Sequence, residues 1–267
     1  MSRNRTDDAC TVEWAATELL DAETTRTDRD PLTDEWSDLD LATAYRIQDE
    51  ALRRRIARGE RLIGVKLGLT SRAKQLRMGI DVPLVAWLTD AMTLPAGAPM
   101  PRDSLIHPRA EPEIVFVMAD RLTGPGITAS QALSAVDQVY CGIEVIDSRY
   151  RDFRFTLPDV VADNASSGRF VLGSLGVAPG ALDLAEEACR LEVDGQVVDR
   201  ATGAAVQGHP AEALALAANV LAERGLAIEP GWIVLSGGMT DAVAVPPGAR
   251  VTAHFTHLGS ITLDGGH

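Results

Sequence analysis

The sequence predicts an α+β protein, with a mainly helical N-terminal region at residues 1–100 and a β-rich domain at residues 101–267. Two observations support this class. Helix candidates dominate the first hundred residues, whereas from about Ile106 short apolar segments alternate with turn residues. No internal repeat, coiled-coil heptad or low-complexity tract interrupts either part. We therefore expect helices at the front of the chain and a sheet-based domain behind them.

The N-terminal region contains two helix candidates. The first runs from Val12 to Ala22. The second can be capped by Ser37 or Asp38 and ended by Gly59. Its apolar residues recur on one face, at Leu41, Tyr45, Leu52 and Ile56. A strand containing Lys66 follows at residues 62–69, and Thr70 or Ser71 can begin a short helix that ends at Gly79.

The C-terminal part contains most of the predicted strands. Asp194-Gly195 supplies the positive φ angles that a hairpin turn at residues 191–198 needs. Thr128 and Gln131 form a capping-box pattern before a helix that ends near residue 137. Pro210 and Gly225 bracket a longer helix. The other strands are expected at residues 113–119, 139–147, 232–236, 250–255 and 260–263.

Composition limits the partners and the compartment. The chain has 267 residues, 46% hydrophobic and 24% charged, as in an ordinary globular protein. A formal charge of −13 excludes nucleic-acid backbones and anionic membranes as favourable partners. Three cysteines without CxxC spacing favour a reducing compartment, and Cys141 is expected to be an inert core residue. With no transmembrane stretch and no signal-peptide pattern, we expect a cytoplasmic protein.

Three glutamates interrupt apolar strand segments. Glu111 and Glu113 are two residues apart and lead into Ile114–Met118, so their side chains share one face. Glu144 interrupts a second apolar run. Like charges in apolar surroundings repel and lose hydration, and a hard divalent cation such as Mg²⁺ or Mn²⁺ would compensate them. A polar edge strand with solvated glutamates is the alternative, and these residues alone leave both open.

Lys66 is one of only two lysines, the other being Lys74 in the polar part of the predicted short helix. Lys66 lies between apolar residues and glycines, in Gly64-Val65-Lys66-Leu67-Gly68. It either extends to the surface or points into a cleft, where it can bind an anion or move a proton. The flanking glycines permit close approach by a ligand or another backbone, which favours the cleft.

Polar residues also gather after the Glu144 segment. Arg149 can pair with a carboxylate of the substrate or of the protein itself. Asp163 and Ser166 lie in a polar stretch, residues 163–169, that suits either turns and caps or the binding of carboxylate and carbonyl oxygens. We treat Arg149, Asp163 and Ser166 as candidate substrate-binding residues.

Four motifs in this order resemble the 2-keto-4-pentenoate hydratase and 4-oxalocrotonate decarboxylase group, within the fumarylacetoacetate-hydrolase-like superfamily. They are Gly64-Val65-Lys66-Leu67-Gly68-Leu69-Thr70-Ser71, His107-Pro108-Arg109-Ala110-Glu111-Pro112-Glu113-Ile114, Glu144-Val145-Ile146-Asp147-Ser148-Arg149 and Val161-Ala162-Asp163-Asn164-Ala165-Ser166-Ser167. The resemblance extends from about Ala44 to Leu263 and implies a β-rich fold around a mixed β-roll. It implies a divalent metal, Mg²⁺ or Mn²⁺, held by Glu111, Glu113 and Glu144. It also implies a substrate pocket with Lys66 and Ser166, a homo-oligomer and an association with a companion hydratase.

Differences within these motifs favour the decarboxylase branch. Hydratases of the group carry Pro-Asp-Phe-Gly after the lysine motif, whereas this chain has Pro83-Leu84-Val85-Ala86. Apolar Leu84 would keep a proton donor and its water away from the product. The stretches Asp147-Ser148-Arg149-Tyr150, Asp152-Phe153, Asn164-Ala165-Ser166-Ser167 and Gly237-Gly238-Met239-Thr240 point the same way.

The resemblance implies metal-dependent loss of CO₂ from 2-oxo-3-hexenedioate, giving 2-hydroxypenta-2,4-dienoate, in the meta-cleavage degradation of aromatic compounds. Lys66 would be the catalytic residue, as an acid–base group or as an electrostatic anchor. Hydration of 2-hydroxypenta-2,4-dienoate is the main alternative. Two others are a lysine Schiff-base decarboxylase with structural glutamates, and a non-catalytic partner of a related enzyme.

Overall fold

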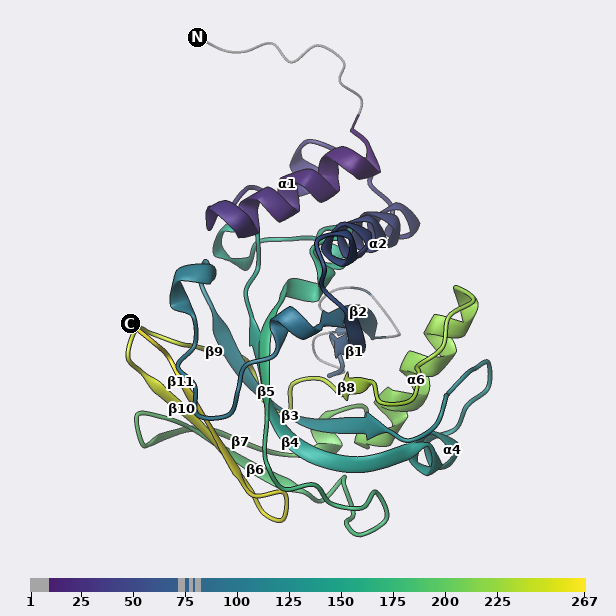
Figure 1. The fold of residues 1–267 in the computed structure, drawn as a ribbon, viewed down its shortest axis with the longest axis vertical. Helices are drawn as coiled ribbons and strands as arrows, with labels where there is room; N and C mark the ends of the chain where they lie inside the picture. The colour runs from purple at the N-terminus through teal and green to yellow at the C-terminus, as the bar shows by residue number, and fades with distance from the viewer. Residues whose placement is uncertain (1–9, 72–74, 77–78, 80–82) are drawn as a thin grey trace.

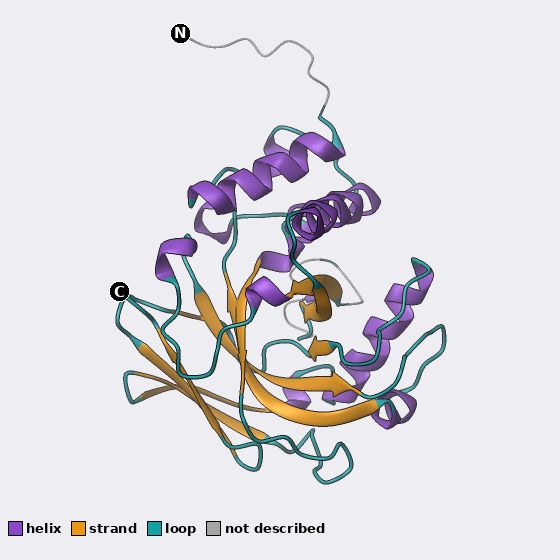
Figure 2. Ribbon diagram, in the orientation of Figure 1, coloured by secondary structure: helices purple, strands orange, loops and turns teal. Residues whose placement is uncertain are grey.

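The computed structural model describes residues 10–71, 75–76, 79 and 83–267. Helices α1 and α2 lie together at one end of the molecule, above two β-sheets that form its body (Figure 1). Helices α4 and α6 lie on the side opposite the second sheet (Figure 2). The predicted α+β class is confirmed, because helices at the front of the chain are followed by a mixed sheet. The strand mixture includes both parallel and antiparallel pairs.

The two N-terminal helices form where the sequence predicts them. Helix α1 (Val12–Thr25) begins at Thr11, whose side chain accepts a hydrogen bond from the Trp14 backbone. Helix α2 (Leu41–Ala57) is capped by Asp40, so the prediction that Ser37 or Asp38 caps it was wrong. The Asp40 carboxylate accepts from the Thr43 backbone N–H at 2.7 Å, which fixes the start of the helix. The two helices pack on each other, and α2 also packs on α5 (Leu157–Ala162).

The first sheet positions the candidate site. Within the described residues its strand order is β2-β1-β8-β3-β4-β5, with β9 beside β3. The strands are β1 (Leu62–Gly68), β2 (Leu84–Thr89), β3 (Arg109–Met118), β4 (Val136–Ile146), β5 (Ser167–Leu172), β8 (Ile233–Leu235) and β9 (Val243–Ala244). Strand β3 lies inside this sheet, between β8 and β4. All its residues except Arg109 and Val117 are buried.

The second sheet is antiparallel and lies against the first. Its order, within the described residues, is β11-β10-β6-β7. The strands are β6 (Ala188–Val193), β7 (Gln196–Thr202), β10 (Arg250–Phe255) and β11 (Ser260–Asp264). The hairpin predicted around Asp194-Gly195 joins β6 to β7, and both turn residues have positive φ.

Short helices complete the chain. The capping box at Thr128 and Gln131 opens α4 (Ala129–Ser134), and His209 caps α6 (Pro210–Glu223) through its ring nitrogen. The 3₁₀ helices are η1 (Leu32–Asp34), η2 (Asp90–Met92), η3 (Arg102–Ser104), η4 (Arg151–Phe153), η5 (Asn164–Ser166) and η6 (Gly203–Ala205). The short helix predicted from residue 70 to 79, which includes Lys74, falls mostly outside the described residues. Strands β2 and β5 were not predicted.

Side chains alternate between two environments across the first sheet. Ile114, Phe116 and Met118 of β3 face the main hydrophobic core, together with Ile143 and Val145 of β4. Residues two apart in a strand share a face, so the glutamates of β3 and β4 project to the opposite side. That side also carries a smaller apolar group, Leu88, Met92, Val115, Phe170 and Leu235. The sheet thus separates the core from the candidate site.

The boundary expected at residue 100 stays a prediction. Strands β1 and β2 come from the N-terminal side of that boundary, yet they pair with each other and β1 pairs with β8 of the C-terminal side. Much of the N-terminal segment is therefore part of the same sheet as the candidate site. The described stretch before β1 forms a helical layer of its own (Figure 2).

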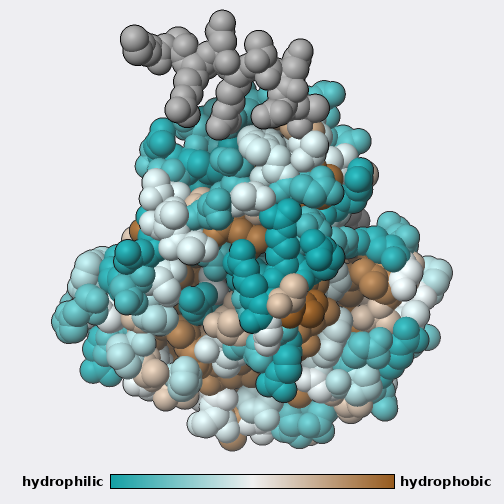
Figure 3. Space-filling view, turned by 45° about the horizontal axis from the view of Figure 1, so that its top comes forward, coloured by the Kyte–Doolittle hydropathy of each residue, from teal (hydrophilic) through white to brown (hydrophobic). Residues whose placement is uncertain are grey.

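The exterior combines hydrophilic surface with separate hydrophobic patches on the face shown in Figure 3. Large exposed hydrophobic residues come from different elements, among them Ile56 of α2, Val198 of β7 and Leu226 after α6. Scattered residues of this kind are normal for a folded protein. Among the described residues, no helix has both the length and the apolar character needed to cross a membrane.

The cysteines provide a test of the packing. Burial raises the pKa of Cys141 to about 11 and that of Cys189 to about 12, whereas Cys10 is half-buried near the start of α1. Because the thiolate is the reactive form, we expect a disulfide reagent at pH 8 to label Cys10 alone in the native protein. All three should react in guanidinium chloride. Rapid native labelling of three thiols would contradict the packing of the two sheets.

Candidate active site

Three buried glutamates converge on one face of the first sheet. Glu111 and Glu144 are directly opposite each other in the β3–β4 ladder, and Glu113 is opposite Gly142. One carboxylate oxygen from each residue lies within 4.8 Å of the others. Glu113 and Glu144 are 0% and 1% exposed, so the alternative of a solvated edge strand was wrong. The same-face prediction for Glu111 and Glu113 is confirmed.

The cluster is under electrostatic strain. Burial, followed by repulsion from Glu144 and Glu111, raises the pKa of Glu113 well above its usual value. Burial also raises the pKa of Glu144, although nearby Lys66 lowers it. Glu113 Oε2 accepts a hydrogen bond from the Gly237 backbone N–H at 2.7 Å. Its other oxygen, Oε1, is buried and has no hydrogen-bond partner among the described residues.

Two glycines let the loop after β8 approach the cluster. Gly237 has a φ of +108°, which side chains other than glycine rarely adopt. A Cβ at Gly238 would lie 2.1 Å from Glu111 Oε2. The Gly237-Gly238 pair therefore allows backbone to contact two carboxylates at once.

Lys66 points into the site, as the sequence predicts. Its neighbours Val65 and Leu67 face the main core, so Lys66 faces the opposite side of β1. Its Nζ lies 3.1 Å from Glu144 Oε1, and the lysine is 2% exposed. Gly64 permits the close approach of β8, because a Cβ there would lie 1.9 Å from the Ile233 carbonyl oxygen. Lys66 is thus fixed against the carboxylate cluster from a central strand.

A cavity of about 660 Å³ adjoins the cluster. Lys66, Leu84, Glu111 and Ser166 line it, four of the residues that the sequence analysis assigned to the site. Its size is that of a pocket for a small organic ligand. Leu84 is 4% exposed and begins β2, opposite Gly68 in the strand ladder. The apolar wall predicted at this position is therefore part of the cavity.

An unusual backbone turn brings Ser166 to the cavity. Asn164, Ala165 and Ser166 have φ values of 51°, 49° and 57°, a run of left-handed conformations that non-glycine residues seldom adopt. The Asn164 side chain holds the turn against β2, since it accepts from the Trp87 N–H and donates to the Trp87 carbonyl. The hydroxyl of Ser166 donates to Asp163 at 3.3 Å. Strain concentrated in this way is typical of functional sites.

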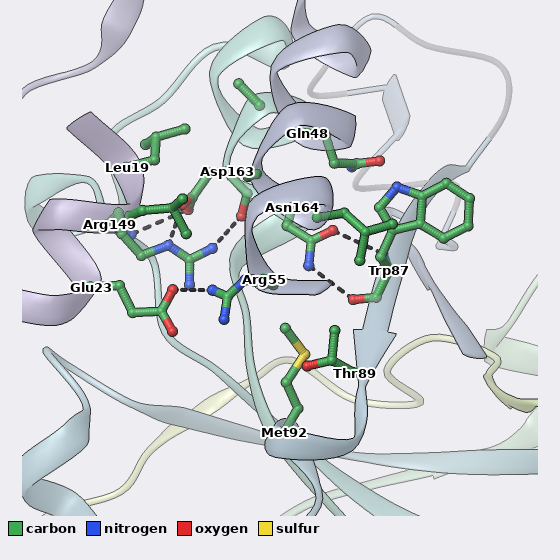
Figure 4. A pocket seen from close by; sticks show the side chains of 14 residues that line it. Leu19, Glu23, Gln48, Arg55, Trp87, Thr89, Met92, Arg149, Asp163 and Asn164 are labelled. Carbon is green, nitrogen blue, oxygen red and sulfur yellow. Dashed lines mark hydrogen bonds and ion pairs between the residues drawn. The ribbon is translucent and has the colours of Figure 1, made fainter. Parts of the chain in front are cut away.

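Arg149 and Asp163 lie behind that turn and do not line the cavity. Their side chains form a buried ion pair (Figure 4). The Arg149 guanidinium also donates to the carbonyls of Asp147 and Ser167. Of the two pairings that the sequence left open for Arg149, the structure has the one with a protein carboxylate. The substrate-binding role of Arg149 and Asp163 stays a prediction, and these contacts argue for structural support instead.

A second ion pair lies beside this support, between Glu23 of α1 and Arg55 of α2 (Figure 4). The small pocket around it is lined by residues of α1, α2 and β2 and by Arg149, Asp163 and Asn164. The helical layer is thereby joined to the loop that carries Ser166. The pair is half-buried, which shields it from water less than the Arg149–Asp163 pair is shielded.

Several residues that line the cavity were not predicted to bind the substrate or the metal: Arg109, Asp152, Phe153, Phe155 and Asp241. Arg109 could have been found, because it precedes Glu111 by two residues in the same strand and so shares its face. Phe153 and Asp241 lie in loops, and no periodicity in the sequence places them. His254 and His257 lie elsewhere, and they pair with Glu192 and with Glu187, respectively.

The donor set suits a hard divalent cation. Carboxylate oxygens are the ligands that Mg²⁺ and Mn²⁺ prefer. The unpartnered Glu113 Oε1 offers a ligand atom, and a cation would offset the mutual repulsion of three buried carboxylates. One carboxylate is already partly neutralised by Lys66. Glu111 is the member of the cluster that lines the cavity.

The fold and this carboxylate site define a member of the fumarylacetoacetate hydrolase class. Residues 62–264 match the family model of the fumarylacetoacetate (FAA) hydrolase C-terminal domain, and the chain belongs to that family. The match begins at the first residue of β1 and ends at the last residue of β11. The resemblance drawn from the four motifs is thus confirmed.

Individual relatives show to which enzymes of this family the chain is similar. The chain is 42% identical, over 97% of its length and 98% of the relative's, to 4-oxalocrotonate decarboxylase of Pseudomonas sp. (strain CF600). The structure of 4-oxalocrotonate decarboxylase from Pseudomonas putida G7 complexed with magnesium and adipate matches with a TM-score of 0.93. That match has 40% identity and covers 98% of this chain and 99% of the other. A 2-hydroxyhexa-2,4-dienoate hydratase of Comamonas testosteroni is 39% identical over 87% of this chain and 89% of its own.

The electrostatic strain predicts the effect of Glu113→Gln on stability. Because the pKa of Glu113 is raised in the folded state, its ionisation opposes folding as the pH rises above the usual carboxyl range. In EDTA at pH 8 we therefore expect Glu113→Gln to raise the free energy of unfolding by about 1–3 kcal/mol. Chemical denaturation measures this. The gain should shrink at pH 5.

Glu229→Gln is the control, because Glu229 pairs with Arg121 at the surface. It should change stability by less than about 0.5 kcal/mol. A Glu113→Gln protein that is less stable than the unchanged chain at pH 8 without metal would show that the cluster is not strained.

Proposed function

We propose that the protein catalyses metal-dependent decarboxylation of 2-oxo-3-hexenedioate, also called 4-oxalocrotonate, to 2-hydroxypenta-2,4-dienoate and CO₂. This reaction belongs to the meta-cleavage degradation of aromatic compounds. The observation that carries the proposal is the buried cluster of Glu111, Glu113 and Glu144 beside Lys66 at the wall of a cavity. The 42% identity to a 4-oxalocrotonate decarboxylase supports the choice of reaction.

The metal would be held by Glu111, Glu113 and Glu144 and would be Mg²⁺ or Mn²⁺. When bound, such a cation supplies a Lewis acid for the 2-oxo acid end of the substrate. The chain's own contribution is to keep three carboxylates on one face of β3 and β4 and to exclude water from two of them. The Gly237 N–H holds Glu113 so that its other oxygen points away from the loop.

Loss of CO₂ breaks the bond between C5 and C6 of the substrate. The electron pair moves through the conjugated double bond to the 2-oxo oxygen, which gains negative charge and takes up a proton. Lys66 is the catalytic residue in this proposal, because its ammonium lies at the carboxylate cluster and can stabilise or protonate that oxygen. Ser166, which lines the same cavity, can orient the substrate through its hydroxyl.

Leu84 would decide between decarboxylation and hydration. Its buried apolar side chain lines the cavity near Ser166 and Lys66. An apolar wall favours loss of a charged carboxylate as neutral CO₂, and it provides no group to activate water. An acidic residue at this position would be a proton-transfer group in direct contact with the product.

Hydration of 2-hydroxypenta-2,4-dienoate is the second candidate function, since a hydratase is 39% identical to this chain over most of its length. The carboxylates and Lys66 serve that reaction equally well. We also propose a cytoplasmic location, a homo-oligomeric assembly and an association with a companion hydratase, following the resemblance to the family.

The reaction can be tested by incubating the purified protein with Mg²⁺ and 2-oxo-3-hexenedioate and measuring CO₂ release. We expect turnover that EDTA abolishes and that added Mg²⁺ or Mn²⁺ restores. Water addition to 2-hydroxypenta-2,4-dienoate without CO₂ release would establish the hydratase instead. Activity in EDTA together with borohydride trapping of substrate on Lys66 would establish a Schiff-base enzyme, and a metal-free inactive protein would indicate a non-catalytic partner.

Leu84→Asp tests the apolar wall. A carboxylate at this buried position would add a proton-transfer group, so we expect CO₂ release to fall by about tenfold, or roughly 1.4 kcal/mol in the barrier. Hydration of the dienoate product should become measurable as a decrease in the absorbance of the dienoate. Leu84→Asn is the control for polarity without an acid, and it should lower decarboxylation without introducing hydration.

A further inference from the structure

Two cationic side chains line the cavity among the described residues, Lys66 and Arg109. Lys66 is engaged by Glu144 at 3.1 Å. Arg109 is half-buried, and no described carboxylate or carbonyl accepts a hydrogen bond from its guanidinium. Its contact is with the ring face of Phe153, 4.1 Å from the guanidinium carbon to the ring centroid. Arg109 thus has its hydrogen-bond donors available to a ligand.

The position of Arg109 relates it to the carboxylate cluster. It is the first residue of β3, and Glu111 and Glu113 follow at two-residue intervals on the same face. Two residues of strand span about 7 Å. A ligand with one end at the cluster therefore meets the Arg109 side chain a few bonds further along the cavity.

The surroundings hold Arg109 in place. The Phe153 ring lies against Arg109 and also stacks with His107, at 4.8 Å between ring centroids. The Asp147 carboxylate accepts hydrogen bonds from the backbone N–H groups of Ile106 and His107, which fixes the chain just before β3. A guanidinium stacked on an aromatic face keeps its edge free for a planar carboxylate.

Arg109 is the described cationic side chain that can bind an anion in the part of the cavity beyond the carboxylate cluster. Asp152 lines the same cavity and is exposed, and its charge would repel an anionic ligand. A dicarboxylate therefore needs a cation beyond the cluster. A six-carbon diacid spans about 6 Å between its terminal carbons, which is comparable with the rise of about 7 Å along β3 from Glu111 to Arg109.

We propose that Arg109 binds the distal carboxylate of a six-carbon 2-oxo dicarboxylate and is the residue that selects diacids over monoacids. Phe153 is the positioning residue, because it acts through Arg109. This inference rests on the proposed function for the identity of the substrate. Bidentate donation from a guanidinium suits a carboxylate, in contrast to the point charge of a lysine.

The decarboxylation step predicts whether loss of Arg109 changes substrate binding, measured as KM, or the catalytic rate, measured as kcat. The distal carboxylate is the group that leaves as CO₂, so its charge decreases in the transition state. The ion pair with Arg109 is stronger in the bound substrate than in the transition state. Loss of Arg109 should therefore raise KM by about 10- to 100-fold without lowering kcat.

Binding to the Mg²⁺-loaded protein tests the proposal directly. The probes are 2-oxoadipate, a saturated diacid that lacks the conjugated route for losing CO₂, and 2-oxohexanoate, which has the same chain length without the distal carboxylate. Calorimetry should show that the unchanged protein prefers 2-oxoadipate. Arg109→Gln should lose about 10- to 100-fold in affinity for 2-oxoadipate and bind 2-oxohexanoate as before.

Matched variants keep the test decisive. Arg121→Gln removes the same charge from a surface ion pair with Glu229 and should leave the preference intact. Arg109→Lys should restore part of it, and Phe153→Leu should weaken it with Arg109 present. Mg²⁺ affinity, measured on each variant, reports that the carboxylate cluster has formed.

Equal loss of affinity for both probes in Arg109→Gln and Arg109→Lys, with Mg²⁺ binding retained, would overturn the role of Arg109 in diacid selection. So would an unchanged preference. If the unchanged protein decarboxylates 2-oxo-3-hexenedioate in that case, the proposed function stands without this inference. If it does not decarboxylate but Arg109 still governs the diacid preference, the inference stands and the reaction is another one.

Discussion

The burial of three like-charged carboxylates on one face of a central sheet is the constraint on which the rest of the site depends. The β3–β4 register places Glu111 opposite Glu144 and Glu113 opposite a glycine. A Cβ on that glycine, Gly142, would lie 2.6 Å from a methyl group of Val115. Such a cluster is stable only where neighbouring groups offset its charge. Lys66 and the Gly237 N–H offset part of it, and the remainder favours a divalent cation.

The polar residues around this cluster form two groups, one that supports the turn carrying Ser166 and one that lines the cavity. Arg149 and Asp163 use their hydrogen-bonding capacity on each other and on nearby backbone, so they hold the turn that carries Ser166. The left-handed run from Asn164 to Ser166 is tolerated because these contacts determine it. Some polar residues of the four motifs therefore support the site and do not face a ligand. The N-terminal helices pack behind these supporting residues.

The same support serves related reactions, which explains why decarboxylases and hydratases are similar along most of this chain. In both reactions an enolate would form at the 2-oxo acid end of the substrate, and a cation and a lysine would stabilise it. The outcome then depends on what surrounds the remote end of the substrate. In our proposal that end meets apolar Leu84 and the Arg109 guanidinium, which lies on the Phe153 ring. The choice between decarboxylation and hydration would therefore depend on contacts at a distance from the three glutamates.

The sequence by itself determined the fold class, most of the strands and the three glutamates, because strand alternation and turn chemistry are local properties. It also placed Lys66 in a cleft, since flanking glycines and apolar neighbours left few other positions for it. Strands β2 and β5 were missed, and the cap of α2 was wrong by two or more residues. Only the tertiary structure decided whether Arg149 faces a ligand or Asp163, because that depends on which loop packs behind β5. For the same reason only the folded chain showed that Phe153, from a loop some forty residues away in sequence, lies on Arg109 beside the carboxylates.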